Sequence, residues 1–300
     1  MDARSSFDAP SGFFENWDAS RADQQLALER LSIHSSGITE LYRSRSGGRN
    51  RLYKVLAPEY RGILLYESIL RKEFEIGFSL THPGICAYYA FTQLEGLGSA
   101  IELEWIEGCT LREWLKQGPS AQQRRSVLNQ LLEALAYMHR KQVIHRDLKP
   151  ENIMITYQGN HVKVIDFGFA DSDAHAINKG AAGTRKYAAP ELIEGRKADE
   201  RSDIWSVGVI MEELLPSYTA IARHCQMAAP EKRYPNVPAL QKALAARRRL
   251  WMIPALIVLL ITGALVWNFR TYGDHALDTL VREAEEAIST AISLSEYFHP

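Results

Sequence analysis

The sequence predicts an α+β protein with two lobes, followed by a single transmembrane helix. Three observations predict this arrangement. Short apolar runs separated by turn residues fill an N-lobe of about residues 23–106, and apolar residues at helical spacing dominate a C-lobe of about residues 107–246. No charged residue then occurs between Arg249 and Arg270, and this gap is long enough for a membrane-spanning helix over residues 250–269.

Composition narrows the class of protein. Of the 300 residues, 46% are hydrophobic and 24% are charged, which excludes a fully disordered chain, a collagen-like repeat and a multi-pass membrane protein. The 35 basic and 36 acidic residues give a net charge of −1, so no overall basic surface for nucleic acid is expected. The scattered Cys86, Cys109 and Cys225 lack C-x-x-C spacing, which argues against a disulfide framework and a zinc site.

The N-lobe is predicted to combine several strands with one helix. A polar leader over residues 1–22 comes first. The predicted strands are 41–44, 52–56, 86–93 and 99–106. Gly47-Gly48 separates the first two strands, and a helix over residues 66–80 is ended by His82-Pro83-Gly84.

The C-lobe is predicted to be mostly helical. Residues 110–140 form helices, because apolar side chains recur there at helical spacing. These side chains are Leu128, Leu131, Leu132, Leu135 and Met138. Two short strands, 153–156 and 162–165, precede a loop rich in Gly and Ala, and a mostly apolar helix follows over residues 201–215.

Three motifs follow one another in the C-lobe. They are the run H-R-D-L-K-P-E-N from His145 to Asn152, then Asp166-Phe167-Gly168, then Ala189-Pro190-Glu191. In this order and at these spacings they resemble the motifs of the eukaryotic-type (Hanks-type) serine/threonine protein kinase family, in its bacterial membrane-anchored form. The resemblance covers residues 26–246. It implies a bilobal protein-kinase fold that uses ATP and Mg²⁺ to phosphorylate Ser and Thr hydroxyls of proteins.

The resemblance implies roles for four residues of these motifs. Asp147 would accept the proton of the attacking hydroxyl, and Lys149 would neutralise charge near the γ-phosphate. Asn152 and Asp166 would hold Mg²⁺, because hard oxygen ligands suit a hard cation. The Lys149-Pro150-Glu151-Asn152 run is typical of the serine/threonine branch of the family.

Lys54 resembles the lysine that holds the α- and β-phosphates, and Glu73 is its expected partner on the following helix. Glu75 is the alternative partner, but it would point about 200° around the helix from Glu73. The other nucleotide-binding residues that the resemblance implies are Ser36, Gly37, Thr39, Leu41, Leu52, Leu103, Glu104, Ile106 and Met154. Among them, Leu103 would be the gatekeeper beside the adenine, and the Glu104 and Ile106 backbones would hydrogen-bond the adenine edge.

The loop expected to cover the phosphates departs from the family pattern G-x-G-x-x-G-x-V. The residues at its three glycine positions are His34, Ser36 and Thr39. Glycine lets a backbone approach phosphates closely, so a bulkier clamp is expected, with the Ser36 and Thr39 hydroxyls as partial substitutes. Leu52, where the family usually has alanine, narrows the adenine pocket. These departures favour the alternative function, a membrane-anchored pseudokinase that acts as a nucleotide-binding or scaffold protein. A small-molecule kinase of the same fold is a third possible function.

The resemblance also implies structural roles. A stack of Gly77, Tyr88, Phe167 and His145 would link the lobes, and we expect the large Tyr88 to fill the space over Gly77. Asp203 would brace the backbone of the catalytic loop. In addition, Arg233 would pair with Glu191, as a buried ion pair that is costly to break on one side.

Activation is expected to be constitutive or assembly-driven. Between residues 166 and 191 the only hydroxyls are those of Ser172, Thr184 and Tyr187, which offers little for phosphorylation to act on, although Arg146 is typical of kinases controlled in that way.

The uncharged stretch predicts the location of the protein. A helix over residues 250–269 is about 30 Å long, which matches a bilayer core. Pro254 is expected in its first turn, where proline is tolerated. Arg247-Arg248-Arg249 before the span, against Arg270 after it, place the kinase part in the cytoplasm and residues 270–300 outside. The tail has an apolar helical stripe, and it could self-associate, bind a partner, lie on the membrane or remain solvated. A buried helix of the kinase lobe is the alternative to the span.

Overall fold

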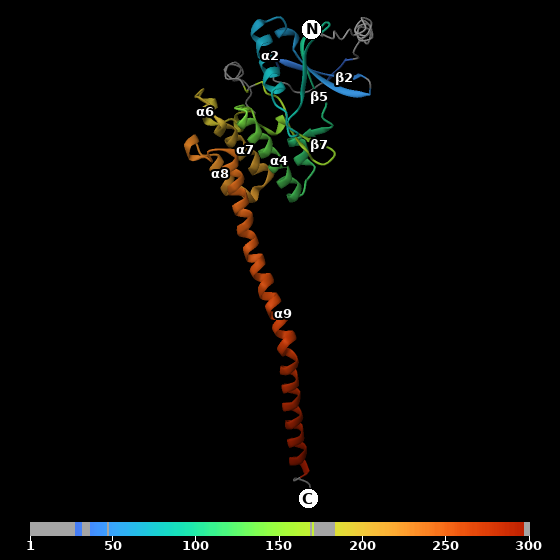
Figure 1. The fold of residues 1–300 in the computed structure, drawn as a ribbon, viewed down its shortest axis with the longest axis vertical. Coiled ribbons are helices and arrows are strands. Elements are labelled where there is room, and N and C mark those ends of the chain that lie inside the picture. The colour runs from blue at the N-terminus through green and yellow to red at the C-terminus, as the bar shows by residue number, and fades with distance from the viewer. Residues whose placement is uncertain (1–27, 32–36, 47, 169, 171–183, 297–300) are drawn as a thin grey trace, which may run out of the picture. The chain divides into compact units, whose positions relative to one another are not determined.

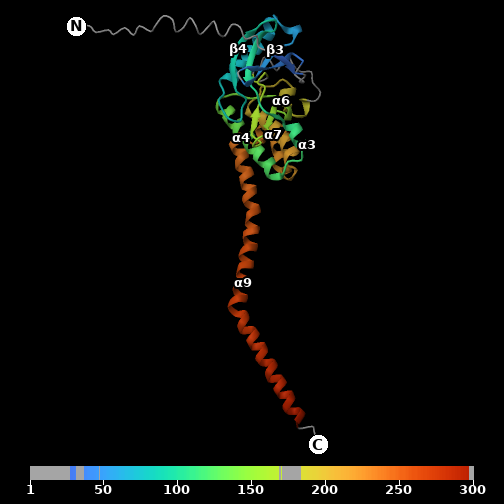
Figure 2. The ribbon, with the colours of Figure 1, turned by 90° about the vertical axis from the view of Figure 1, so that its right-hand side faces the viewer.

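The computed structural model describes residues 28–31, 37–46, 48–168, 170 and 184–296. The chain divides into two compact units, Met1–Leu240 and Gln241–Pro300. The first unit contains both lobes. Figure 1 shows the N-lobe with β2, β5 and α2 and the C-lobe with α4, α7 and α8. Figure 2 shows the same two lobes after a turn of 90° about the vertical axis. The predicted leader, residues 1–22, lies outside the described residues.

An antiparallel five-stranded sheet with the order β1-β2-β3-β5-β4 forms the N-lobe. Its strands are β1 Leu28–Leu31, β2 Thr39–Ser46, β3 Arg49–Leu56, β4 Tyr88–Leu94 and β5 Gly98–Glu104. Side chains alternate between the two faces of a strand. On β3, therefore, Tyr53 and Val55 enter a core with Ala100, whereas Lys54 points to the opposite face.

Helix α2, Leu64–Phe78, packs against β3, β4 and β5. It begins and ends two residues before the predicted helix over 66–80. Its buried residues are Leu70, Glu73 and Gly77, which fall on one face at helical spacing. A buried acidic residue on the packed face of a helix requires a polar partner.

The C-lobe combines a small sheet with helices, of which α4 is the longest at 20 residues. Its sheet has the order β6-β7-β8, with β6 Gly108–Thr110, β7 Ile153–Thr156 and β8 Val162–Val164. Its helices are α3 Leu111–Lys116, α4 Ala121–Arg140, α6 Pro190–Ile193, α7 Glu200–Leu214 and α8 Thr219–Cys225. Short 3₁₀ turns lie at Pro58–Tyr60 in the N-lobe and at Pro150–Asn152, Thr184–Lys186, Pro216–Tyr218 and Pro230–Lys232 in the C-lobe.

The stretch predicted to be helical over 110–140 is two helices. Gly118, with φ +70°, and Pro119 separate them, because neither residue continues a helix easily. Each helix begins with a capping box, at Thr110 for α3 and at Ser120 for α4, which satisfies amide groups that the first turn leaves unpaired. The apolar side chains predicted to share a face of α4 are all buried: Leu128, Leu131, Leu132, Leu135 and Met138.

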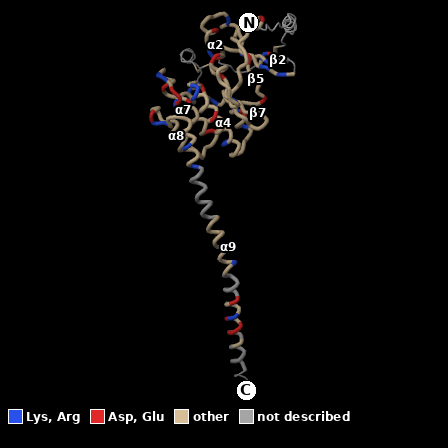
Figure 3. Tube along the Cα trace, viewed as in Figure 1, with Lys and Arg blue, Asp and Glu red and all other residues tan. Residues whose placement is uncertain are grey.

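A single helix, α9, runs from Val237 to Glu296. Pro254 therefore lies well inside this helix and not in a first turn, which corrects the prediction. Within the described residues, no helix combines the length and apolarity needed to cross a membrane. The side chains of residues 250–258, in the predicted span, are outside that description. The described Asp and Glu residues of α9 gather in its C-terminal part (Figure 3).

Candidate active site

Residues from both lobes meet at Lys54. Its Nζ donates to Glu73 Oε1 and Oε2, each at 2.8 Å, and to Asp166 Oδ1 at 2.8 Å. Burial opposes the charge on Lys54, but the carboxylates of Asp166 and Glu73 outweigh it and raise the lysine pKa above its ordinary value. The structure thus pairs Lys54 with Glu73. Glu75 takes no part in this cluster.

Asp166 is held as an anion. Burial would raise its pKa, but the ammonium of Lys54 outweighs burial and lowers the pKa to about 2. Its backbone has φ +65°, a left-handed conformation that an aspartate rarely adopts. In this conformation its Oδ1 accepts from Lys54, and the next residue, Phe167, is fully buried. About a third of the Asp166 side chain stays exposed, so the carboxylate is both charged and accessible.

The predicted catalytic loop residues contact one another. Asp147 Oδ2 accepts hydrogen bonds from Lys149 Nζ at 2.7 Å and from Asn152 Nδ2 at 2.9 Å. Asn152 Nδ2 also donates to the backbone carbonyl of Asp147 at 2.8 Å. Burial raises the pKa of Asp147, although the charge of Lys149 opposes the rise. A carboxylate with a raised pKa is a better proton acceptor.

Asp203, at the start of α7, fixes the backbone of this loop. Its carboxylate is fully buried and accepts from the amide of His145 (Oδ2) and the amide of Arg146 (Oδ1), both at 2.9 Å. His139 Nε2 lies 2.8 Å from the same carboxylate. Arg146 has φ +64°, so these hydrogen bonds hold a strained backbone immediately before Asp147. The predicted bracing role of Asp203 is confirmed.

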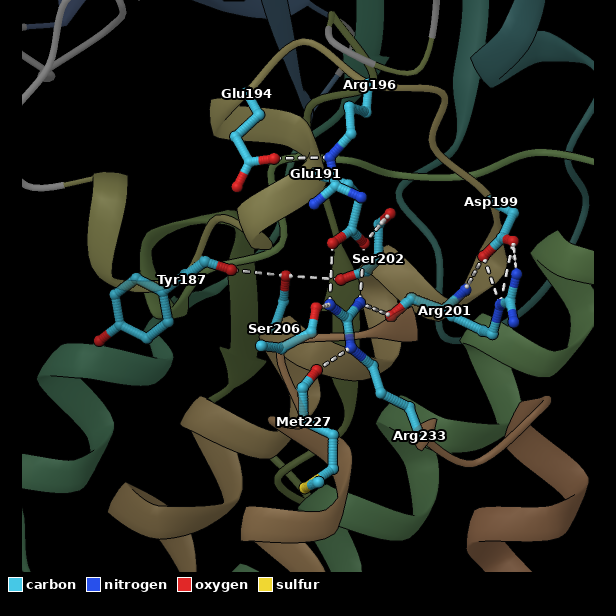
Figure 4. Close-up of polar contacts among 11 residues, drawn as sticks. Tyr187, Glu191, Glu194, Arg196, Asp199, Arg201, Ser202, Ser206, Met227 and Arg233 are labelled. Carbon is cyan, nitrogen blue, oxygen red and sulfur yellow. Dashed lines mark hydrogen bonds and ion pairs between the residues drawn. The ribbon is translucent and has the colours of Figure 1, made fainter. Parts of the chain in front are cut away.

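The predicted pair of Arg233 and Glu191 is confirmed as well. Arg233 donates to both carboxylate oxygens of Glu191, at 2.7 and 2.8 Å, and the two residues are 3% and 2% exposed. Ser202 Oγ also donates to Glu191, and Arg233 Nε donates to the carbonyl of Met227 (Figure 4). The pair joins α6, the start of α7 and the segment before α9, and lies outside the catalytic cluster.

The predicted adenine-binding residues lie at the junction of the lobes. Leu52 and Leu103 are directly opposite each other on β3 and β5. The Glu104 amide already donates to the carbonyl of Ala87 at 2.9 Å, which narrows the expected adenine contact of Glu104 to its carbonyl. The Glu104 side chain accepts from Lys163 Nζ at 2.8 Å. Nothing in the sequence pattern pointed to this second role.

The other nucleotide residues divide between the lobes. Thr39 and Leu41 lie on β2, with Leu41 opposite Lys54, and Met154 lies on β7. Ile106 follows β5 in the linker between the lobes. Gly37 has φ +80°, a conformation that favours glycine. The remaining predicted residues of the phosphate-covering loop, His34 and Ser36, lie outside the described residues, as does Ser172 of the activation segment.

Asn152 and Asp166 suit the Mg²⁺ that they were assigned. Asn152 Nδ2 is engaged with Asp147, which leaves the amide oxygen as the free ligand atom, and Asp166 supplies an ionised carboxylate. Mg²⁺ commonly takes only one or two protein oxygens and completes its shell with phosphates and water. No cluster of three or more His, Cys, Asp or Glu side chains able to hold a metal is found among the described residues.

Sequence reasoning missed two hydrogen-bonded features. The Tyr88 hydroxyl donates to Glu73, although only the bulk of Tyr88 had been expected to matter. The Tyr187 hydroxyl accepts from Arg112 at 2.8 Å and donates to Glu213 at 2.7 Å, which ties the activation segment to α3 and α7. These hydrogen bonds join residues that are distant in sequence, so no local sequence pattern predicts them.

Comparisons with known proteins agree with this geometry. The chain matches the protein kinase domain model over residues 43–250. It is 33% identical over 201 residues to the serine/threonine-protein kinase PrkC of Bacillus subtilis, a match that covers 62% of this chain and 31% of PrkC. It is 38% identical over 151 residues to Aurora kinase A-B of Xenopus laevis, covering 50% of this chain and 36% of that kinase.

A solved structure has a similar fold. The kinase domain of PknI from Mycobacterium tuberculosis superposes with a TM-score of 0.56 at 19% identity, covering 71% of this chain and 94% of that one. The chain spans about a third of the length of the curated relatives described above. The family model nevertheless covers most of the chain and includes every residue of the Lys54 and Asp147 clusters. The chain belongs to the protein kinase domain family.

Proposed function

We propose that this protein is an ATP-dependent kinase that transfers the γ-phosphate to Ser and Thr hydroxyls of proteins, and that it is tethered to the membrane. The convergence of Lys54, Glu73 and Asp166 through hydrogen bonds of 2.8 Å carries the catalytic part of the proposal. A cation held between two carboxylates is positioned for phosphate oxygens, and phosphoryl transfer depends mainly on such positioning and on charge neutralisation.

Asp147 is the proton acceptor in this proposal. Lys149 and Asn152 both donate to Oδ2. Among the described residues no hydrogen bond reaches Oδ1, so this oxygen is available to accept from a substrate hydroxyl. The raised pKa of Asp147, caused by burial, strengthens it as a base. Lys149, held at 2.7 Å from Asp147, neutralises charge at the transferred phosphoryl group. Asn152 and Asp166 would hold Mg²⁺, which would neutralise further phosphate charge when bound.

The serine/threonine preference rests on Lys149, two residues after Asp147, and on relatives whose names state that specificity. A scaffold without transferase activity is the second candidate. The observation that favours it is the phosphate-covering loop, in which His34, Ser36 and Thr39 stand at the glycine positions of the family.

Phosphate transfer from labelled ATP with Mg²⁺ separates these two functions. The full chain is compared with Asp147→Asn and Asp166→Ala on itself and on generic protein substrates, followed by phosphoamino-acid analysis. We expect label on Ser and Thr, and a loss of about 100-fold or more in Asp147→Asn, as is typical for removal of a general base. A wild-type chain that binds ATP and transfers no phosphate would support the scaffold.

The membrane part of the proposal is supported by residues 250–269, which carry no charge, and by Arg247-Arg248-Arg249 before them. The positive-inside rule then places the catalytic lobes in the cytoplasm and residues 270–300 outside. Self-association through the helix or the tail would bring two catalytic domains together and drive activation by assembly.

Membrane fractionation tests the tether. We expect the full chain to resist alkaline extraction from membranes. A variant with Leu259→Lys and Leu260→Lys should move to the soluble fraction, because each charge at the centre of a span costs about 3 kcal/mol. A wild-type chain that is soluble without detergent would contradict the tether and leave the catalytic proposal intact.

A further inference from the structure

Tyr88, at the start of β4, lies against the buried carboxylate of Glu73. Its hydroxyl donates to Glu73 Oε1 at 3.1 Å, and the two residues are 6% and 4% exposed. Glu73 Oε1 also accepts from Lys54, and Oε2 accepts from Lys54 a second time. Three hydrogen bonds therefore fix this carboxylate, and one of them comes from outside the ion pair.

Gly77 makes room for the tyrosine ring. It lies four residues after Glu73, on the same face of α2, and its φ is not in the left-handed region. A Cβ atom at Gly77 would lie 2.6 Å from Cδ1, Cδ2 and Cε2 of Tyr88, closer than real Cβ atoms come to other atoms. The glycine is therefore explained by close packing of Tyr88 on the helix and not by a backbone requirement.

The ring of Tyr88 begins a row of ring contacts that extends into the C-lobe. Its centroid is 5.7 Å from that of Phe167, which in turn is 5.5 Å from that of His145. An aliphatic side chain would fill the same space and would not hydrogen-bond Glu73. Burial and the nearby charge of Glu73 raise the pKa of Tyr88 well above its ordinary value, so the hydroxyl keeps its proton and remains a donor.

We propose that Tyr88 is a positioning residue, whose hydroxyl holds Glu73 in the orientation that presents both carboxylate oxygens to Lys54 and keeps α2 against the sheet. Tyr88 touches no reacting group and acts through Glu73. The consequence for catalysis rests on the proposed function, because it requires that Lys54 serve the phosphates. The effect on α2 does not depend on that function.

Substitution Tyr88→Phe keeps the ring and removes the hydroxyl. A hydrogen bond to a charged group contributes about 1.5 to 3 kcal/mol. If Tyr88→Phe loses this free energy in the transition state, kcat should fall about tenfold or more. The KM for the protein substrate, which Lys54 does not contact, should stay within about twofold of wild type. The matched control is Tyr53→Phe, a buried tyrosine one residue from Lys54 on the opposite face of β3, and it should retain full activity.

A double-mutant cycle shows whether Tyr88 acts through Glu73. In a Glu73→Gln background, Tyr88→Phe should change kcat by less than about twofold, because the carboxylate that it positions is gone. An equal loss from Tyr88→Phe in both backgrounds would show that its role is packing or folding, and would overturn the proposal.

Amide hydrogen exchange gives a readout that needs no activity. Tyr88→Phe should speed exchange in α2, Leu64–Phe78, about tenfold relative to wild type, with α4, Ala121–Arg140, unchanged as the internal reference. Unchanged exchange in α2 refutes the positioning role. If the wild-type chain transfers no phosphate, the proposed function fails, and the exchange experiment still decides the role of Tyr88.

Discussion

The buried pair of Arg233 and Glu191 allows a prediction whose size follows from the structure. Substitution Arg233→Met removes both hydrogen bonds to Glu191 and those to the carbonyls of Met227 and Arg201. The Glu191 carboxylate is 2% exposed, and among the described residues it would keep only Ser202 as a hydrogen-bond donor from a side chain. Breaking one side of a buried ion pair typically costs about 3 to 5 kcal/mol, because the remaining charge stays out of water.

Thermal unfolding of the chain in detergent measures this cost. For a domain of this size, a loss of 3 to 5 kcal/mol lowers the melting temperature by roughly 6 to 20 °C. The matched control is Arg201→Met. Arg201 pairs with Asp199, and the two side chains are 31% and 46% exposed, so its loss should cost about 1 kcal/mol or less. Figure 4 shows both pairs within one view of the C-lobe.

The double variant Glu191→Gln with Arg233→Met completes the cycle. It should be more stable than the sum of the two single losses predicts, because neither charge is left buried without its partner. The reasoning is refuted if Arg233→Met and Arg201→Met lower the melting temperature equally, or if the two single losses add without coupling.

Three further outcomes are expected. Gly77→Leu should lower activity and stability, since its Cβ would meet the Tyr88 ring at 2.6 Å; phosphate transfer and melting temperature measure this, and unchanged values would contradict it. Burial raises the thiol pKa of Cys86 and of Cys225 to about 12, so a thiol reagent at pH 8 should modify neither residue until urea unfolds the chain; rapid labelling of the folded protein would contradict their burial. Burial would raise the pKa of Asp166, but Lys54 lowers it to about 2, so its contribution to stability is present above the ordinary value of 3.8 and is lost as pH falls toward 2. Urea unfolding should therefore show a constant difference between wild type and Asp166→Ala from pH 7 to about 5 that shrinks at lower pH, whereas a constant difference down to pH 2 would refute the lowered pKa.

The parts of the fold that follow from a local sequence pattern were predictable. The face of α4 follows from apolar residues at helical spacing, and α7, Glu200–Leu214, lies within one residue of the predicted helix. The choice of Glu73 came from the family resemblance, and the helical period set Glu75 apart from it, because residues two positions apart on a helix face different directions. Pro254 was misplaced, because where a long helix begins depends on the element before it.

The catalytic cluster was predictable in its members and not in its contacts. The order and spacing of the motifs identified Asp147 and Asp166, and the family resemblance of residues 52–56 identified Lys54. Side-chain contacts between distant segments leave no such trace. The amide of Glu104, for example, donates to the carbonyl of Ala87. The sequence could not reveal this hydrogen bond, because it depends on how β4 and β5 are arranged in three dimensions.

By itself, the sequence determined the kinase motifs, the helical faces and the uncharged stretch of residues 250–269, because each is written in neighbouring residues or in fixed spacings. The sequence also predicted that Tyr88 fills the space over Gly77, but only the tertiary structure decided that the hydroxyl of this ring reaches Glu73. Packing is a property of surfaces that meet after folding, and Tyr88 becomes a hydrogen-bonded neighbour of Glu73, 15 positions earlier in the chain, only when β4 and α2 lie side by side.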